Sequence, residues 1–199
     1  RQRAHQLCPL RRADVHRQRT LAGIAGDEAE QRARMQDRHG EAMGCRALAR
    51  LASLGYAIEE IDIAALLDAA KLLYDGPWVA ERTAALEPFL ASHPDAIDPT
   101  VRGIVEGGLG KSAVEAFRGQ YKLAEYARAA EAVWSRVDVL AVPTSPTIYR
   151  VREMLANPVA LNSHFGTYTN FVNLLDMAAV AVPAGFRLNG TGFGVSFFA

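Results

Sequence analysis

A chain of 199 residues, 50% hydrophobic and 22% charged with no formal net charge, has the composition of an ordinary globular protein. Neutral charge gives no general attraction to nucleic acid or anionic lipid, and no apolar run approaches the roughly 20 residues that span a bilayer. The two cysteines, Cys8 and Cys45, have no companions at metal-ligand spacing, so we expect reduced thiols in a cytoplasmic protein.

The first 46 residues differ in composition from the rest of the chain. They are rich in Arg, Gln, Asp and His and carry only scattered apolar residues, which predicts a poorly ordered segment or at most a solvated helix. A basic arm that touches nucleic acid is the alternative, but acidic residues interrupt the arginines and blunt any positive patch. Residues 47–199 have the pattern of a folded α/β protein, so we place a domain boundary there.

The folded region opens with three short elements. Apolar spacing predicts a helix, a strand and a second helix over 47–54, 56–61 and 64–74. Pro77 suits the first turn of the next helix, which is predicted to run to about residue 90. Asp98 and Pro99 then open another helix as its cap and first-turn proline.

A long helix and a group of apolar strands follow. Ser112 and Glu115 form a capping-box pattern at the start of the long helix. Its apolar face is predicted from Val114, Phe117, Tyr121, Ala124, Val133 and Trp134. A further helix is predicted over 168–175, and strands over 137–142, 178–182 and 193–198. Because these strands are almost continuously apolar, we expect a sheet that helices cover on both faces.

Three chemical patterns are considered and set aside. Glu106–Ser112 resembles a phosphate-binding loop, but Val105 stands where that loop needs glycine and a helix precedes it instead of a strand. Lys111 and Ser112 are adjacent at a helix start, which does not provide a buried, neutral lysine beside a nucleophilic serine. The histidines have no metal-ligand spacing, and His164 is predicted to lie in a surface loop.

Tyr74 and Arg82 are the most informative polar pair. Tyr74 ends one predicted helix and Arg82 lies in the second turn of the next, across the break at Gly76-Pro77. Such a bend can direct a phenol and a guanidinium into one cleft, where arginine would grip a carboxylate with two parallel hydrogen bonds. Spacing alone favours the alternative, a surface arginine paired with Asp75 or Glu81.

Several segments resemble the allophanate hydrolase branch of the amidase-signature family. The most specific is Leu72–Arg82, which contains Tyr-Asp-Gly-Pro-Trp. Further similar segments are Asp98–Ile104, Val137–Thr147, Gly166–Asn173 and Ala181–Phe186. The resemblance as a whole covers about three quarters of the chain, roughly from Leu51 to Ala199.

This resemblance implies a partial amidase-signature fold, a mixed β-sheet flanked by helices, with no metal or organic cofactor. Enzymes of that branch hydrolyse allophanate, the carboxylated form of urea, to ammonia and carbon dioxide in urea degradation. Tyr74 and Arg82 match the positions that hold this substrate, with Arg82 on its carboxylate, so the resemblance shifts our prediction to a binding role for both. Dimers are frequent in the family, so a homodimer is an expected assembly.

The chain also departs from the family. The family's serine segment and its lysine belong well before Leu51, and nothing like them occurs in Arg1–Arg50. We therefore predict no catalytic residue here, and a substrate-recognising fragment that does not hydrolyse allophanate alone. Gly192 also stands where the family usually has proline. Two alternatives stay open: a fragment of a general amidase or amidotransferase subunit, and a non-catalytic interaction module.

Overall fold

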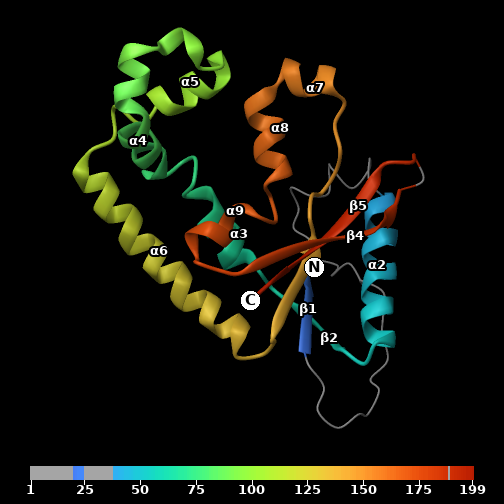
Figure 1. The fold of residues 1–199 in the computed structure, drawn as a ribbon. Coiled ribbons are helices and arrows are strands. Elements are labelled where there is room, and N and C mark those ends of the chain that lie inside the picture. Colours follow the sequence, from blue (N-terminus) through green and yellow to red (C-terminus); the bar gives the residue numbers. More distant parts are fainter. Residues whose placement is uncertain (1–19, 25–37, 188) are drawn as a thin grey trace, which may run out of the picture.

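The computed structural model describes residues 20–24, 38–187 and 189–199, which form an α/β fold (Figure 1). Its sheet has the spatial order β2-β1-β3-β5-β4. The strands are β1 (Thr20–Ile24), β2 (Ala57–Ile61), β3 (Val139–Pro143), β4 (Ala179–Phe186) and β5 (Gly192–Phe198). Strand β1 runs parallel to β2 and β3, whereas β5 runs antiparallel to β3 and β4. The predicted mixed sheet flanked by helices is therefore confirmed.

Helices pack on both faces of this sheet. Helix α2 (Arg38–Ser53) lies against one face, and the opposite face is covered by α3 (Ala64–Lys71), α6 (Ala113–Trp134) and α9 (Asn170–Leu174). The pair α4 (Trp78–Ser92) and α5 (Pro99–Glu106) stands away from the sheet, and α6 runs from this pair back to it (Figure 1). The remaining helical elements are η1 (Pro94–Ala96), α7 (Val151–Ala156) and α8 (Pro158–Phe165).

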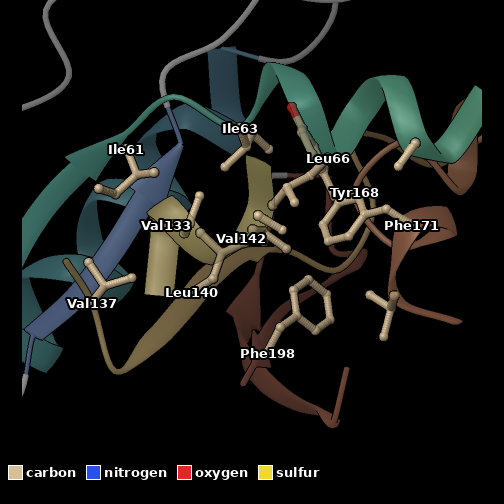
Figure 2. Close-up of a cluster of buried hydrophobic side chains, with 13 residues drawn as sticks. Ile61, Ile63, Leu66, Val133, Val137, Leu140, Val142, Tyr168, Phe171 and Phe198 are labelled. Carbon is tan, nitrogen blue, oxygen red and sulfur yellow. The ribbon is translucent and has the colours of Figure 1, made fainter. Parts of the chain in front are cut away.

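Strand β3 divides the apolar core into two layers. Leu140 and Val142 are buried in the layer beneath α3, α6 and α9, where they meet Phe198 of β5 (Figure 2). Ala141 points the other way and packs with Met43 of α2. Successive side chains of a strand alternate between its two faces, so one short apolar strand supplies both layers.

The predicted helix starts at Asp98 and Ser112 are confirmed. The Asp98 carboxylate accepts hydrogen bonds from the backbone N–H groups of Thr100 and Val101. At the start of α6, the Ser112 hydroxyl accepts from the Glu115 N–H at 3.2 Å while the Glu115 carboxylate accepts from the Ser112 N–H at 2.8 Å. The hydrogen bonds that the Glu115 carboxylate accepts from the N–H and the hydroxyl of Ser112 hold the pKa of Glu115 below its usual value. Ser112 is thus a helix cap.

The apolar face predicted for α6 is largely wrong. Val114, Phe117 and Tyr121 are between 56% and 67% exposed. The buried positions of α6 are Gly119, Ala130 and Val133, with Leu123, Tyr126 and Trp134 half-buried. Helix α6 packs on the core only through its second half, so the aromatic residues of its first half meet no described neighbour that would bury them.

Strand β4 is exposed, contrary to the prediction that helices cover every closing strand on both faces. Nearly every residue from Ala179 to Phe186 is exposed, and Val180 and Phe186 are 57% and 75% exposed. The reason is its place in the sheet: within the described part of the chain, β4 is an edge strand that pairs with β5 alone, and none of its residues belongs to the apolar layer beneath α3, α6 and α9.

The structure extends order towards the N-terminus. Helix α2 begins at Arg38, nine residues before its predicted start, and β1 lies between β2 and β3. Most of the segment 1–46, including Cys8, lies outside the described residues, so its proposed separation from residues 47–199 stays a prediction. Cys45 in α2 is a free thiol.

His164 is not in a loop. It lies in the last turn of α8, a helix that the sequence analysis did not predict, and its Nδ1 atom is hydrogen-bonded to the hydroxyl of Tyr149. Burial lowers the pKa of His164 and raises that of Tyr149. The neutral imidazole therefore serves as a partner for the phenol and joins α8 to the segment that follows β3.

Candidate functional site

Tyr74 lies in a tight turn between α3 and α4. This turn continues the helical hydrogen bonding of α3, because the N–H groups of Asp75 and Gly76 donate to the carbonyls of Lys71 and Leu72 at 2.9 and 3.1 Å. A methyl group on Gly76 would lie 2.4 Å from the Leu72 carbonyl oxygen. Glycine is therefore required for the turn that presents Tyr74.

Arg82 returns to Tyr74 from the second turn of α4. Pro77 occupies the N-cap position of that helix, and the guanidinium carbon of Arg82 lies 5.3 Å from the centre of the Tyr74 ring. A cation stacked on an aromatic face at this distance is a favourable contact. Both side chains are half-buried. The structure thus brings together the two residues that the sequence analysis singled out as a binding pair.

The polar groups of this pair are not engaged by other described side chains. Across residues 20–24, 38–187 and 189–199, neither the Arg82 guanidinium nor the Tyr74 hydroxyl takes part in an ion pair or a hydrogen bond. Asp75 and Glu81, the alternative partners considered for Arg82, are exposed and form no ion pair with it. Hence the N–H donors and the hydroxyl remain available to a ligand.

A buried threonine holds the arginine helix to its neighbour. Thr83 is 4% exposed, and its hydroxyl lies within hydrogen-bonding distance of the carbonyl oxygens of Val79, at 2.9 Å, and Val105 of α5. Arg82 therefore belongs to a helix that is joined to α5 through the very next residue, Thr83. Thr83 was missed in the sequence because its bonding partner lies in another helix.

The lysines provide no candidate base for serine chemistry. Lys71 and Lys122 form ion pairs with carboxylates on their own helices, and Lys111, which precedes α6, pairs with Glu115 of that helix. In the part of the chain that the structure describes, there is no group of three His, Cys, Asp or Glu side chains that could hold a metal ion. No described helix is long and apolar enough to cross a membrane.

The arrangement at Tyr74 and Arg82 is suited to a small planar anion. A guanidinium matches a carboxylate with two parallel N–H donors, and a nearby phenol adds one directed hydroxyl. The pair can therefore bind and orient a ligand through these donors.

Comparison with known sequences gives two urea amidolyases. The protein of Saccharomyces cerevisiae is 44% identical over 152 residues, and that of Lachancea kluyveri is 42% identical over 153 residues. The matches cover 75% and 76% of this chain but only 8% of each relative. No family model matches the sequence.

Solved structures extend the similarity to the fold. The allophanate hydrolase of Kluyveromyces lactis superposes with a TM-score of 0.84 at 35% identity, over 92% of this chain and 29% of that one. A bacterial aryl acylamidase of the amidase-signature family matches with a TM-score of 0.62 at 15% identity, over 92% of this chain and 40% of that one. This second match shows the fold alone, and it confirms the predicted architecture.

Proposed function

Because this chain belongs to the amidase-signature family and matches a segment of its allophanate hydrolase branch, we propose that it is a substrate-recognising part of such an enzyme. The substrate class is a small carboxylated urea derivative. Tyr74 and Arg82 bind it, with the Arg82 guanidinium on the carboxylate. No residue of this chain is assigned a catalytic role, and no metal or cofactor is required for binding.

One observation carries this proposal. The guanidinium of Arg82 lies over the Tyr74 ring, and among the described residues it is held by no carboxylate. An arginine kept in place by an aromatic ring is oriented without being neutralised, which is the state that an anionic ligand needs. Thr83, buried and bonded to α5, supports that orientation.

Replacing Arg82 with alanine tests the proposal by ligand binding. Malonamate, in which a CH2 group replaces the central NH of allophanate, supplies a stable carboxylated amide. We expect calorimetric titration of the whole chain to detect binding that Arg82→Ala weakens by about tenfold or more, because the charged hydrogen bonds lost contribute about 1.5–3 kcal/mol.

Two controls accompany the Arg82 variant. Arg102→Ala also removes one guanidinium, but Arg102 pairs with Asp95 and Glu106, so malonamate affinity should stay within about twofold. Malonamide, which has a second amide in place of the carboxylate, should bind weakly to the unchanged chain and to Arg82→Ala alike. Equal loss of malonamate affinity in the Arg82 and Arg102 variants would contradict the assignment, as would tight binding of malonamide.

The purified chain is expected to release no ammonia from allophanate above the background rate. The described lysines are all ion-paired, and no residue here is assigned as a nucleophile. Loss of a nucleophile and its base costs many orders of magnitude in rate, roughly 10⁶ in a well-studied hydrolase. An ammonia assay with the complete K. lactis enzyme as positive control checks this, and steady release by this chain would refute it.

Three further features complete the proposal. A cytoplasmic location and a homodimer are part of it, as is a role in urea degradation. A general amidase fragment with a neutral amide substrate is the nearest alternative. It is separated from the main proposal by the malonamate and malonamide titrations, since only a carboxylated ligand should depend on Arg82.

A second candidate function, a non-catalytic interaction module, is favoured by β4. This strand is apolar and exposed from Ala179 to Pro183 and pairs with β5 alone among the described residues. Backbone groups on such an edge can accept a further strand from another molecule. Light scattering of the free chain tests this candidate, because a strictly monomeric protein at all concentrations would count against it.

A further inference from the structure

Two glycines lie where the start of α4 packs most closely on its neighbours. Gly119 is a buried position of α6, and Gly108 is buried in the turn between α5 and α6. We call this pair the glycine seat. The two sites contact α4 on successive turns.

Gly119 lies directly against the proline and tryptophan that begin α4. A methyl group added there would come within 2.4 and 2.7 Å of Cγ and Cδ of Pro77, and within 3.1 Å of the Trp78 ring. The first two separations are shorter than real carbon contacts. A proline ring has little freedom to move, so a side chain at 119 would have to displace the helix start itself.

Gly108 meets the next turn of the same helix. A methyl group there would lie 2.0 Å from the Thr83 hydroxyl oxygen and 2.8 Å from the Ala80 Cα and the Val79 carbonyl oxygen. Backbone atoms cannot rotate away as the end of a long side chain can. Any residue larger than glycine would also disturb the Thr83 contact with Val105 that joins α4 to α5.

We infer that Gly119 and Gly108 are positioning residues for the ligand-binding pair. By admitting no side chain, they let α4 approach α6 and α5 closely enough to hold the Arg82 guanidinium over the Tyr74 ring. They touch no ligand themselves. The role in ligand binding rests on the proposed function. The position of Arg82 over the Tyr74 ring can be measured without a ligand.

Gly119→Ala in the whole chain is the first test, with Gly103→Ala as its matched control. Gly103 also lies in a helix, α5, and a methyl group on it meets nothing within 4 Å. NMR reads the arrangement directly, because protons of Arg82 held over the Tyr74 ring are shifted upfield. Calorimetry with malonamate measures its consequence, and thermal melting reports overall stability.

The expected result is that Gly119→Ala moves the Arg82 proton shifts towards free-chain values and weakens malonamate binding about ten- to hundredfold. Gly103→Ala should leave both unchanged. Adding Pro77→Ala to Gly119→Ala removes the shortest contacts and should restore part of the upfield shift and part of the affinity. General destabilisation would not be reversed by this second substitution.

Three results would overturn the inference: upfield shifts retained in Gly119→Ala, equal losses in Gly103→Ala, or no upfield shift in the unchanged chain. If the shifts follow the inference but the unchanged chain does not bind malonamate, the proposed function fails while the positioning role stands. Should Gly119→Ala not fold, Thr83→Val supplies the test. It keeps the shape and removes the hydroxyl, and it should reduce the upfield shift by a smaller amount.

Discussion

Phe198→Ala is expected to lower the free energy of unfolding by about 3–5 kcal/mol, which is enough to leave the chain largely unfolded or marginally stable. Phe198 is 2% exposed and packs edge-to-face on Phe171, with ring centres 5.6 Å apart. It also stands opposite Leu140 in the β3–β5 register, in the layer shown in Figure 2. Truncation removes the ring from the centre of that layer and leaves a cavity. Urea unfolding followed by circular dichroism measures the change.

Phe186→Ala provides the matched comparison. Phe186 ends β4, the neighbour of β5 in the sheet, but its side chain is 75% exposed. Its truncation should change the free energy of unfolding by no more than about 0.5 kcal/mol. If the two alanine variants unfold at the same urea concentration, the assignment of Phe198 to the centre of the core is wrong.

Features that depend on neighbouring residues in sequence could be predicted. Asp98 caps α5 and Ser112 caps α6, because each cap bonds to N–H groups two or three residues away. The Tyr74–Arg82 pair belongs to the same group only in its proximity, because spacing alone favoured a surface arginine and the family resemblance led to the predicted binding role. Both residues flank one turn, so the short sequence between them limits how far apart they can lie.

Features that depend on contacts between residues distant in sequence could not be predicted. The aromatic residues Phe117 and Tyr121 have helical spacing, yet the side of α6 that packs inward is the one with Gly119 and Ala130. Periodicity shows that a helix has an apolar side, but the neighbouring elements decide which side is covered. Gly119 has no side chain and so contributes nothing to a pattern of apolar residues. Its contact Pro77 lies 42 positions earlier in the sequence.

The outer strand limits prediction in the same way. Apolar composition suggested that β4 lies inside a covered sheet, and its composition is indeed that of an interior strand. Its exposure is set by which strands are present to pair with it. The apolar composition of β4 suits a buried strand, but the described residues leave its side chains exposed.

Because β4 is apolar but exposed, the substitution Val180→Lys is expected to suppress self-association of the chain. Val180 is 57% exposed on β4, and an uncharged outer strand invites pairing with a second copy. A lysine from each copy would be brought to the shared edge, where desolvation and repulsion cost more than about 1.4 kcal/mol, or about tenfold in the dissociation constant. Size-exclusion chromatography with light scattering at two protein concentrations measures the effect.

Val114→Lys is the control for charge alone. Val114 is 58% exposed, nearly the same as Val180, but it lies on the first turn of α6 and not on a strand edge. If both lysine variants reduce association equally, net charge explains the result and β4 is not the contact. If only Val180→Lys remains monomeric at the higher concentration, association proceeds through the open edge of the sheet, because that edge is what distinguishes the two sites.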